Sequence, residues 1–189
     1  MNQKPPSLAW IEKVTGLLDG FAELTGRMVS WLTLATVLVT LAVVILRYLF
    51  DMGSIALQES VTYLHASVFM LGAAYTLKHD GHVRVDIFYQ QRSPRLRAWT
   101  NLLGTLLLLM PVCILIFVSS IDYVASAWAI QEGSREAGGL DGVYLLKTII
   151  PLMAVLLFLQ GCSIVLRSLF TIAGREAPAD NSTALDREL

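Results

Sequence analysis

Charged side chains are scarce in this sequence. Asp, Glu, Lys and Arg together make up 15% of its 189 residues, while hydrophobic residues make up 55%. Soluble domains carry about 25% charged residues. This deficit disfavours a large soluble core and indicates an integral membrane protein. The formal net charge is −1, and no five consecutive like charges occur, so nothing in the charge pattern indicates nucleic-acid binding.

Cysteine is also rare. The only two are Cys113 and Cys162, and both lie inside apolar runs. They are expected to pack as small hydrophobic side chains, because a disulfide framework needs more cysteines and a redox or metal site needs partner ligands.

Sequence motifs typical of enzyme active sites are missing as well. No serine is accompanied by a base and an orienting group, and no glycine-rich phosphate-binding loop is present. His79 and His82 have an HxxH spacing, with Asp80 and Asp86 nearby, but this is a weak metal signal without a defined helix and a third ligand. The sequence therefore predicts no enzyme and no cofactor.

What the sequence does contain is long apolar runs. Residues 28–46, 98–121 and 148–166 hold no charged residue, and residues 55–77 hold only Glu59. Each run is long enough to cross a hydrocarbon core of about 30 Å as a helix. The sequence predicts four membrane spans, with a helix start at Ser93-Pro94 and a kink at Pro111.

Lysine and arginine predict the orientation of these spans. Three precede the first span, five lie between the second and third, and three follow the fourth, whereas the connections on the other side hold three in all. Positive charge accumulates on the cytoplasmic side. Both termini are therefore predicted to be cytoplasmic, in a multi-pass membrane protein.

Residues 8–27 form an amphipathic arm before the first span. At 100° per residue, their apolar side chains gather in one arc of roughly 140°. We expect this arm to lie on the membrane surface or on a partner, with polar residues on its other side. The apolar arc consists of Trp10, Ile11, Val14, Leu17, Leu18, Phe21 and Leu24.

The predicted fold is an all-α membrane protein with four transmembrane helices and an N-terminal interfacial amphipathic helix. Residues 1–27 form the cytoplasmic N-terminus with its arm, 28–170 the four-span domain and 171–189 a cytoplasmic tail. Spans one and two show none of the breaks typical of transporter cores. An accessory subunit is therefore favoured over a translocating one.

His65 lies within the second predicted span. An ionisable residue at this depth is a functional candidate. A haem would need a second histidine on a facing helix, and a proton relay would need a chain of acids, neither of which the spans contain. We expect His65 to hydrogen-bond across helices, as we do for Gln160, Asn101 and Thr105.

Arg47 and Glu59 end one predicted span and begin the next. Each is costly below the headgroups unless it is paired or reaches water. Three arrangements remain open from the sequence: mutual pairing, pairing with a partner protein, and contact with interfacial water.

Several short motifs follow one another in a recognisable order. They are Arg47-Tyr48, Glu59, Leu71–Ala74, and His82 with Val85 and Asp86. In this order, and over roughly residues 20–170, the chain resembles the DctQ-type small membrane subunit of tripartite ATP-independent periplasmic (TRAP) transporters. A tryptophan often precedes the glutamate in that family, where this chain has Leu57 and Gln58.

The resemblance implies a structural subunit with no catalytic residues of its own. Its partners would be a large membrane subunit that carries substrate with a sodium gradient, a soluble periplasmic substrate-binding protein and membrane lipids. The substrate would be an organic acid. The alternative is a membrane anchor or redox subunit that uses His65. The candidate interface or structural polar residues are Arg47, Gln58, Glu59, His65, His82 and Asp86.

Overall fold

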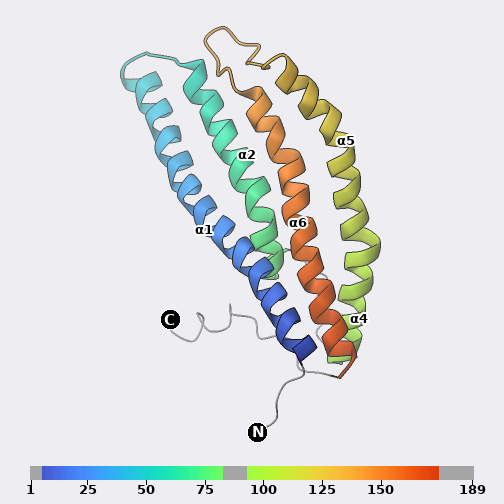
Figure 1. Cartoon of the computed structure of the whole chain (residues 1–189). Helices are drawn as coiled ribbons and strands as arrows, with labels where there is room; N and C mark the ends of the chain where they lie inside the picture. The colour runs from blue at the N-terminus through green and yellow to red at the C-terminus, as the bar shows by residue number, and fades with distance from the viewer. Residues whose placement is uncertain (1–5, 83–92, 175–189) are drawn as a thin grey trace.

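A computed structural model describes residues 6–82 and 93–174 of the chain, and within these ranges it is all helical. Figure 1 shows long helices running side by side. Their bounds are α1 (Pro6–Leu49), α2 (Ile55–Lys78), α4 (Pro94–Gly104), a π-helical turn (Thr105–Leu109), α5 (Met110–Ala129) and α6 (Val143–Ile172).

The bundle has a terminal end and a turn end. At the terminal end α1 and α4 begin and α2 and α6 end; at the turn end lie the 50–54 and 130–142 connections. Ser54 caps α2 by accepting a hydrogen bond from the Leu57 amide (3.4 Å). At the other end of α2, Asp80 takes a left-handed φ of 52°, and the Gly81 amide donates to the Thr76 carbonyl (2.9 Å). This is the Schellman geometry that satisfies the last carbonyls of a helix.

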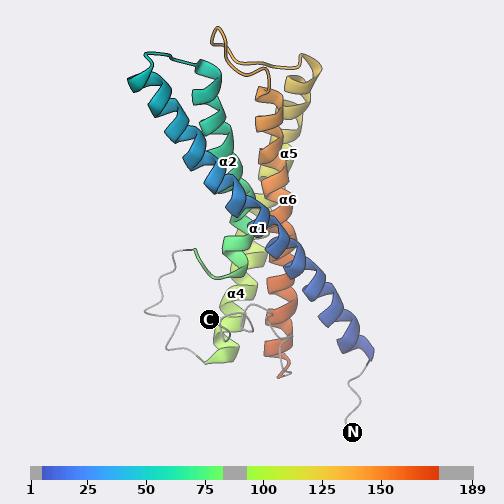
Figure 2. The same ribbon diagram turned by 90° about the vertical axis from the view of Figure 1, so that its left-hand side faces the viewer.

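The predicted arm and the first predicted span are one helix. α1 continues without interruption through residues 27 and 28, where the sequence analysis had placed a boundary. Figure 2 shows α1 crossing the other helices obliquely, so that its N-terminal part extends away from the bundle at the terminal end. Residues 18–27 contain no proline and only two glycines, so local sequence supplies no reason for a break.

α6 is the central helix of the bundle. It contacts α1, α2, α4 and α5. The residues it buries are mostly small or polar, which lets neighbouring helices approach closely. They are Ala154, Leu156, Gln160, Gly161, Ser163, Ser168 and Phe170.

The helix that begins at Pro94, as predicted, continues through Pro111. The wider π-helical turn at Thr105–Leu109 directly precedes that proline. Proline lacks an amide hydrogen and crowds the preceding turn, and a π-turn is one way for a helix to accommodate this.

Among the residues that the structure describes, three helices are long and apolar enough to cross a membrane: Trp10–Leu49 within α1, the continuous Pro94–Ala129 and Val143–Ile172. α2 is not among them, since its first half carries Gln58, Glu59 and His65. Asp86 and Val85 lie outside the described residues.

The Tyr75 ring of α2 packs directly against Gly26 of α1. A Cβ atom built there would lie 2.1 Å from Cδ2 and 2.4 Å from Cγ of Tyr75. Both distances are far below any real contact, so a larger residue forces Tyr75 out of its position. At Gly20, six residues earlier on the same helix, a Cβ would meet nothing within 4 Å.

We therefore expect opposite effects from one substitution at these two glycines. Gly20→Ala should keep or raise the thermal unfolding temperature, because alanine favours a helix by up to about 1 kcal/mol over glycine. Gly26→Ala should lower it, since overpacking costs about 1–3 kcal/mol. Thermal unfolding of the purified subunit in detergent measures both. Equal shifts for the two variants would contradict the close α1–α2 approach.

Candidate functional site

A buried carboxylate joins α1 to α6 near the terminal end. Asp19 on α1 accepts hydrogen bonds from Ser163 Oγ (2.8 Å) and Gln160 Nε2 (3.2 Å), and it forms an ion pair with Arg167. All three partners lie on α6. The Asp19 side chain is 9% exposed, and a buried charge is tolerated only when it is paired and hydrogen-bonded in this way.

One helical turn further along α1, Glu23 ties α1 to the end of α2. Its Oε2 accepts from Lys78 Nζ (2.7 Å) and lies 3.0 Å from Nε2 of His79. The His79 ring also stacks against Tyr75, with centroids 4.3 Å apart. His79, which follows the last residue of α2, thus contacts both a carboxylate and an aromatic ring.

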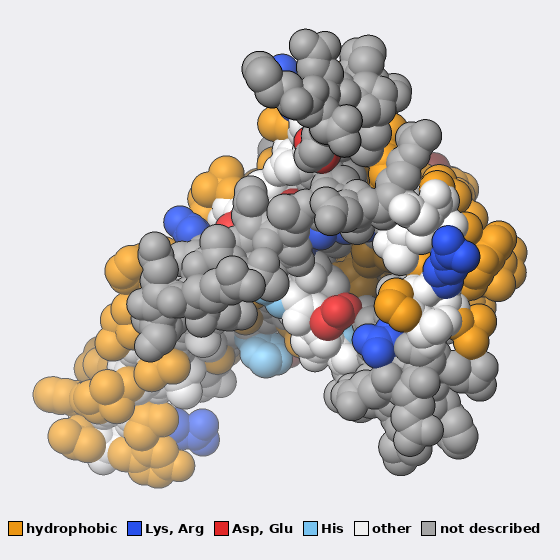
Figure 3. All heavy atoms as spheres, turned by 90° about the horizontal axis from the view of Figure 1, so that it is seen from below, with side chains coloured by type: hydrophobic (Ala, Val, Ile, Leu, Met, Phe, Trp, Pro, Cys, Tyr) orange, Lys and Arg blue, Asp and Glu red, His pale blue; other side chains and the backbone are white. Residues whose placement is uncertain are grey.

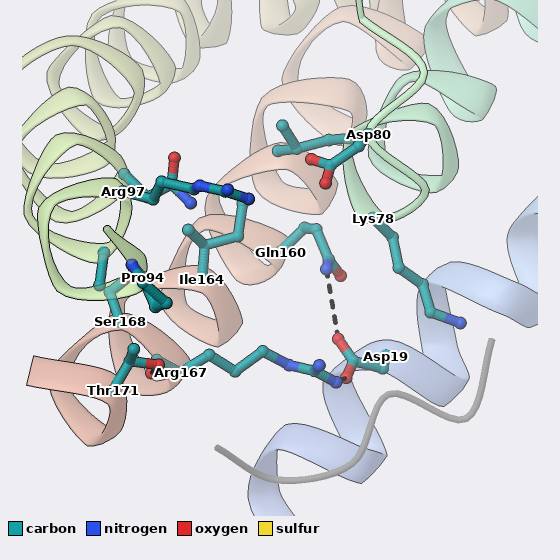
Figure 4. Close-up of a pocket in the computed structure, with 13 residues that line it drawn as sticks. Asp19, Lys78, Asp80, Pro94, Arg97, Gln160, Ile164, Arg167, Ser168 and Thr171 are labelled. Carbon is teal, nitrogen blue, oxygen red and sulfur yellow. Dashed lines mark hydrogen bonds and ion pairs between the residues drawn. The ribbon is translucent and has the colours of Figure 1, made fainter. Parts of the chain in front are cut away.

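A polar cleft of about 310 Å³ lies beside this cluster, between α2, α4 and α6. Figure 4 shows Gln160 and Arg167 reaching from α6 toward Asp19, with Arg97 on the opposite wall. The Gln160 Oε1 atom is buried and has no hydrogen-bond partner. From this end of the molecule, charged side chains lie between flanking hydrophobic ones (Figure 3).

At the turn end, Glu59 holds the 130–142 connection onto α2. Its carboxylate accepts from the Ser134 hydroxyl and from the Leu140 amide (2.7 Å). Gly139 packs against the same cluster: a Cβ there would lie 2.5 Å from the Ser134 Cβ. The connection between α5 and α6 is therefore fixed by a carboxylate of another helix.

A second contact stabilises the start of α6. Lys147 forms an ion pair with Glu132 and lies 3.9 Å from the Tyr123 ring centroid. The Trp128 indole donates to the Thr148 hydroxyl (2.9 Å). These contacts join the last turn of α5 to the first turns of α6.

Arg47 and Glu59 are not joined to each other. Arg47 lies exposed in the last turn of α1 and lines a small recess at the α1–α2 turn with Gln58. In the part of the chain that the structure describes, no ion pair links it to Glu59, whose two oxygens are engaged by the 130–142 connection. Mutual pairing is thus not the arrangement found, and the sequence analysis had not considered a contact with this connection.

The two other described candidates, His65 and His82, are both exposed. His65 lies on α2 and His82 follows its end. Gln160 does hydrogen-bond across helices, as expected. The same was expected of His65, but no hydrogen bond among the described residues reaches its side chain. Across residues 6–82 and 93–174, no three His, Cys, Asp or Glu side chains lie close enough to hold a metal ion.

The apolar arc of the arm faces away from the bundle. Trp10 and Leu17 are 66% and 67% exposed, and Phe21 and Leu24 are also exposed; Ile11, Val14 and Leu18 are half-buried. The buried side instead carries Thr15 and Asp19. The polar side of the arm therefore packs on α6, while its apolar side is left for lipid or another protein.

Sequence reasoning missed Asp19 as a site residue. It placed Asp19 on the polar side of the arm, and it counted Arg167 only toward the orientation. The available signal was their position: Asp19 is the lone acid between Lys13 and Glu23, and Arg167 ends a charge-free run. Only the oblique crossing of α1 over α6 brings the two together.

Removing the Asp19 charge should destabilise the fold. In Asp19→Asn the Arg167 guanidinium loses its counter-charge, with an expected loss of about 3 kcal/mol, the lower end for a broken buried pair because Arg167 keeps some access to water. Asp122→Asn, on the exposed face of α5, is the control and should have little effect. Denaturant unfolding in detergent measures the change. The double variant Asp19→Asn/Arg167→Gln should lose less than the two single losses combined; full additivity would refute the pairing.

Neutralising Glu59 should loosen the 130–142 connection. Hydrogen bonds to charged groups contribute about 1.5–3 kcal/mol, so in Glu59→Gln the Leu140 amide should exchange its hydrogen roughly 10- to 100-fold faster. Hydrogen–deuterium exchange of that segment tests this. Glu136→Gln, in the same connection, and Arg47→Ala should leave the rate unchanged; acceleration in Arg47→Ala would show that Arg47 supports the cluster after all.

Comparison with known proteins bears on what these helices do. No curated protein and no solved structure matches the chain. A family does match: the DctQ component of tripartite ATP-independent periplasmic transporters, over residues 36–171. That range begins within α1, includes α2 and α4 to α5, and ends in the last turn of α6. Since this is well over half of the chain, the protein belongs to the DctQ family of small TRAP-transporter subunits.

Proposed function

We propose that this protein is the four-span scaffold of a sodium-driven transporter in a bacterial inner membrane. It would hold the large translocating subunit in place during uptake of an organic acid that a soluble periplasmic binding protein delivers. The observation that carries the proposal is the family match over residues 36–171, which covers most of the helical bundle.

The surface of the bundle supports an assembly role. Of the most apolar stretch of α1, only 6% is buried inside the chain. Outward-facing large side chains run along its length, among them Trp31, Leu34, Leu38 and Leu41. Continuous apolar surface of this kind needs an apolar environment to cover it, and these side chains of α1 suit the lipid side of a membrane complex.

The internal contacts support a rigid shape. Asp19 and Glu23 fix α1 to α6 and α2 at the terminal end, and Glu59 fixes α2 to the 130–142 connection at the turn end. A scaffold has to resist displacement while a neighbouring domain moves, and charge-assisted bonds at both ends of a bundle serve that purpose.

The positions of polar groups favour an accessory role over translocation. The polar cleft lies at the terminal end, whereas the recess further along, between α5 and α6, is lined by apolar side chains such as Cys113, Phe117 and Phe158. A translocating subunit instead encloses a polar binding site between broken helices near the membrane midplane.

We assign α2 as the fourth span. Its 24 residues rise about 36 Å at 1.5 Å per residue, and it lies between α1 and α6 (Figure 1). The lysine and arginine distribution favours a cytoplasmic position for the terminal end. The apolar arc of the arm would then meet the inner membrane surface or the partner, and the 130–142 connection would face the periplasm and its binding protein.

The proposal predicts that uptake needs all three components. In proteoliposomes with an imposed sodium gradient, this chain alone should transport no organic acid, because it lacks a polar route across the membrane. Adding the large membrane subunit and the binding protein should produce sodium-dependent uptake, and omitting this chain should abolish it. Transport by this chain alone, or unimpaired transport without it, would refute the scaffold role.

A further inference from the structure

The exposed side chains of α2 form a single line along that helix. They are Ile55, Gln58, Thr62, His65 and Phe69, and every other residue of α2 is half-buried or buried. Their spacing alternates between three and four residues. This is the spacing with which one helix packs lengthwise against another, and we call this line the α2 seam.

The middle of the α2 seam is polar, and its polar groups have no partner among the described residues. Within the described parts of the chain, no hydrogen bond or ion pair reaches the side chains of Gln58, Thr62 or His65. His65 lies ten residues into a helix of 24, about 15 Å from its start. If α2 spans the membrane, this imidazole lies near the centre of the bilayer, where hydrocarbon offers it no hydrogen bond.

The hydroxyl groups on the other helices behave differently. Each exposed Ser or Thr on α1, α4 and α5 whose side chain is described donates to a carbonyl of its own helix, as Thr40 does to Thr36 (2.7 Å) and Ser119 does to Ile116 (3.2 Å). The same holds for Ser30, Thr33, Thr100 and Ser126. A hydroxyl satisfied within its own helix can face lipid at little cost. Thr62 has no such bond, so the seam differs from the surfaces suited to lipid.

We propose that the α2 seam is the docking surface for a transmembrane helix of the large subunit, and that this helix supplies hydrogen-bonding side chains to Gln58, Thr62 and His65. Phe69, which is 74% exposed, and Ile55 provide apolar contacts at either end of the seam. The inference rests on the proposed function, because it requires a membrane partner. It also accounts for the lower hydropathy of α2: a span covered by protein on its polar side need not be as apolar as a span surrounded by lipid.

A second copy of this chain is the competing occupant of the seam. Two parallel helices related by a two-fold axis place each residue near its own counterpart. Gln58, Thr62 and His65 each carry a donor and an acceptor, so such pairs can form hydrogen bonds. The large subunit is proposed instead because the matched family is one component of a tripartite transporter, so its members assemble with chains other than themselves.

Photo-crosslinking tests which molecule covers the seam. The full chain, carrying p-benzoylphenylalanine in place of Thr62 or Phe69, is co-expressed with the large subunit and the binding protein and then irradiated in membranes. Thr40 is the control for depth, because it lies nine residues before the end of α1, a position between those of Thr62 and Phe69, which lie seven and 14 residues after the start of α2. We expect an adduct with the large subunit from both seam positions, and at least tenfold less from the Thr40 position. An adduct of two small subunits, or no protein adduct, would overturn the inference.

A second measurement tests the polar groups themselves. Gln58→Leu/His65→Leu makes the seam compatible with lipid and should reduce the recovered large subunit at least fivefold during affinity purification. The unfolding temperature of the isolated chain should not fall, because these side chains make no bond within it. Ser30→Leu/Thr40→Leu is the matched control and should recover the large subunit at the unmodified level.

The outcomes separate the two proposals. If the unmodified chain recovers no large subunit, the scaffold function fails and the inference fails with it. If the unmodified chain recovers the large subunit, and Gln58→Leu/His65→Leu does so equally well, the function stands and the α2 seam is not the docking surface.

Discussion

The Asp19 carboxylate is the constraint on which the position of α1 depends. It is accepted below the protein surface because Arg167, Gln160 and Ser163 reach it from successive turns of α6. An uncompensated carboxylate at this place would be strongly unfavourable, so α1 has to cross α6 where these three groups meet. Because α1 is one continuous helix, fixing residue 19 also determines the direction in which its outward apolar face points.

Both ends of the bundle are held together by carboxylates that accept hydrogen bonds from neighbouring segments. At the terminal end Asp19 and Glu23 accept from α6 and α2; at the turn end Glu59 accepts from the 130–142 connection, beside the Glu132–Lys147 pair. Between these ends the helices touch through small residues and leave most large apolar side chains outside. Internal contacts of this kind fix the directions of the helices, and they leave the flanks open to lipid and to other subunits. This arrangement suits a component of a larger membrane complex.

α2 combines both kinds of contact. Glu59 and Lys78 hold it inside the chain, while its exposed side presents Gln58, Thr62 and His65, which bond to none of the described residues. The same polar residues that give α2 its low hydropathy therefore distinguish its inner side from its outer side. Hydropathy alone does not distinguish the polar residues on the inner side of α2 from those on its outer side, although the two groups have separate structural roles.

The sequence by itself determined the helical class, the membrane character, the helix start at Pro94 and the family, because these follow from local periodicity, from charge-free length and from short motifs. It also identified the polar candidates on α2. Which groups pair was decided only by the tertiary structure. Glu59 meets a connection more than 70 residues away instead of Arg47, and Asp19 meets α6 across more than 140 residues. Such pairings depend on the angle at which helices cross and on which face each one buries, and no local pattern specifies either. The boundary expected near residue 27 is absent for two reasons: the local sequence contains no helix breaker, and the polar side of the arm packs on α6, so that α1 continues as a single helix.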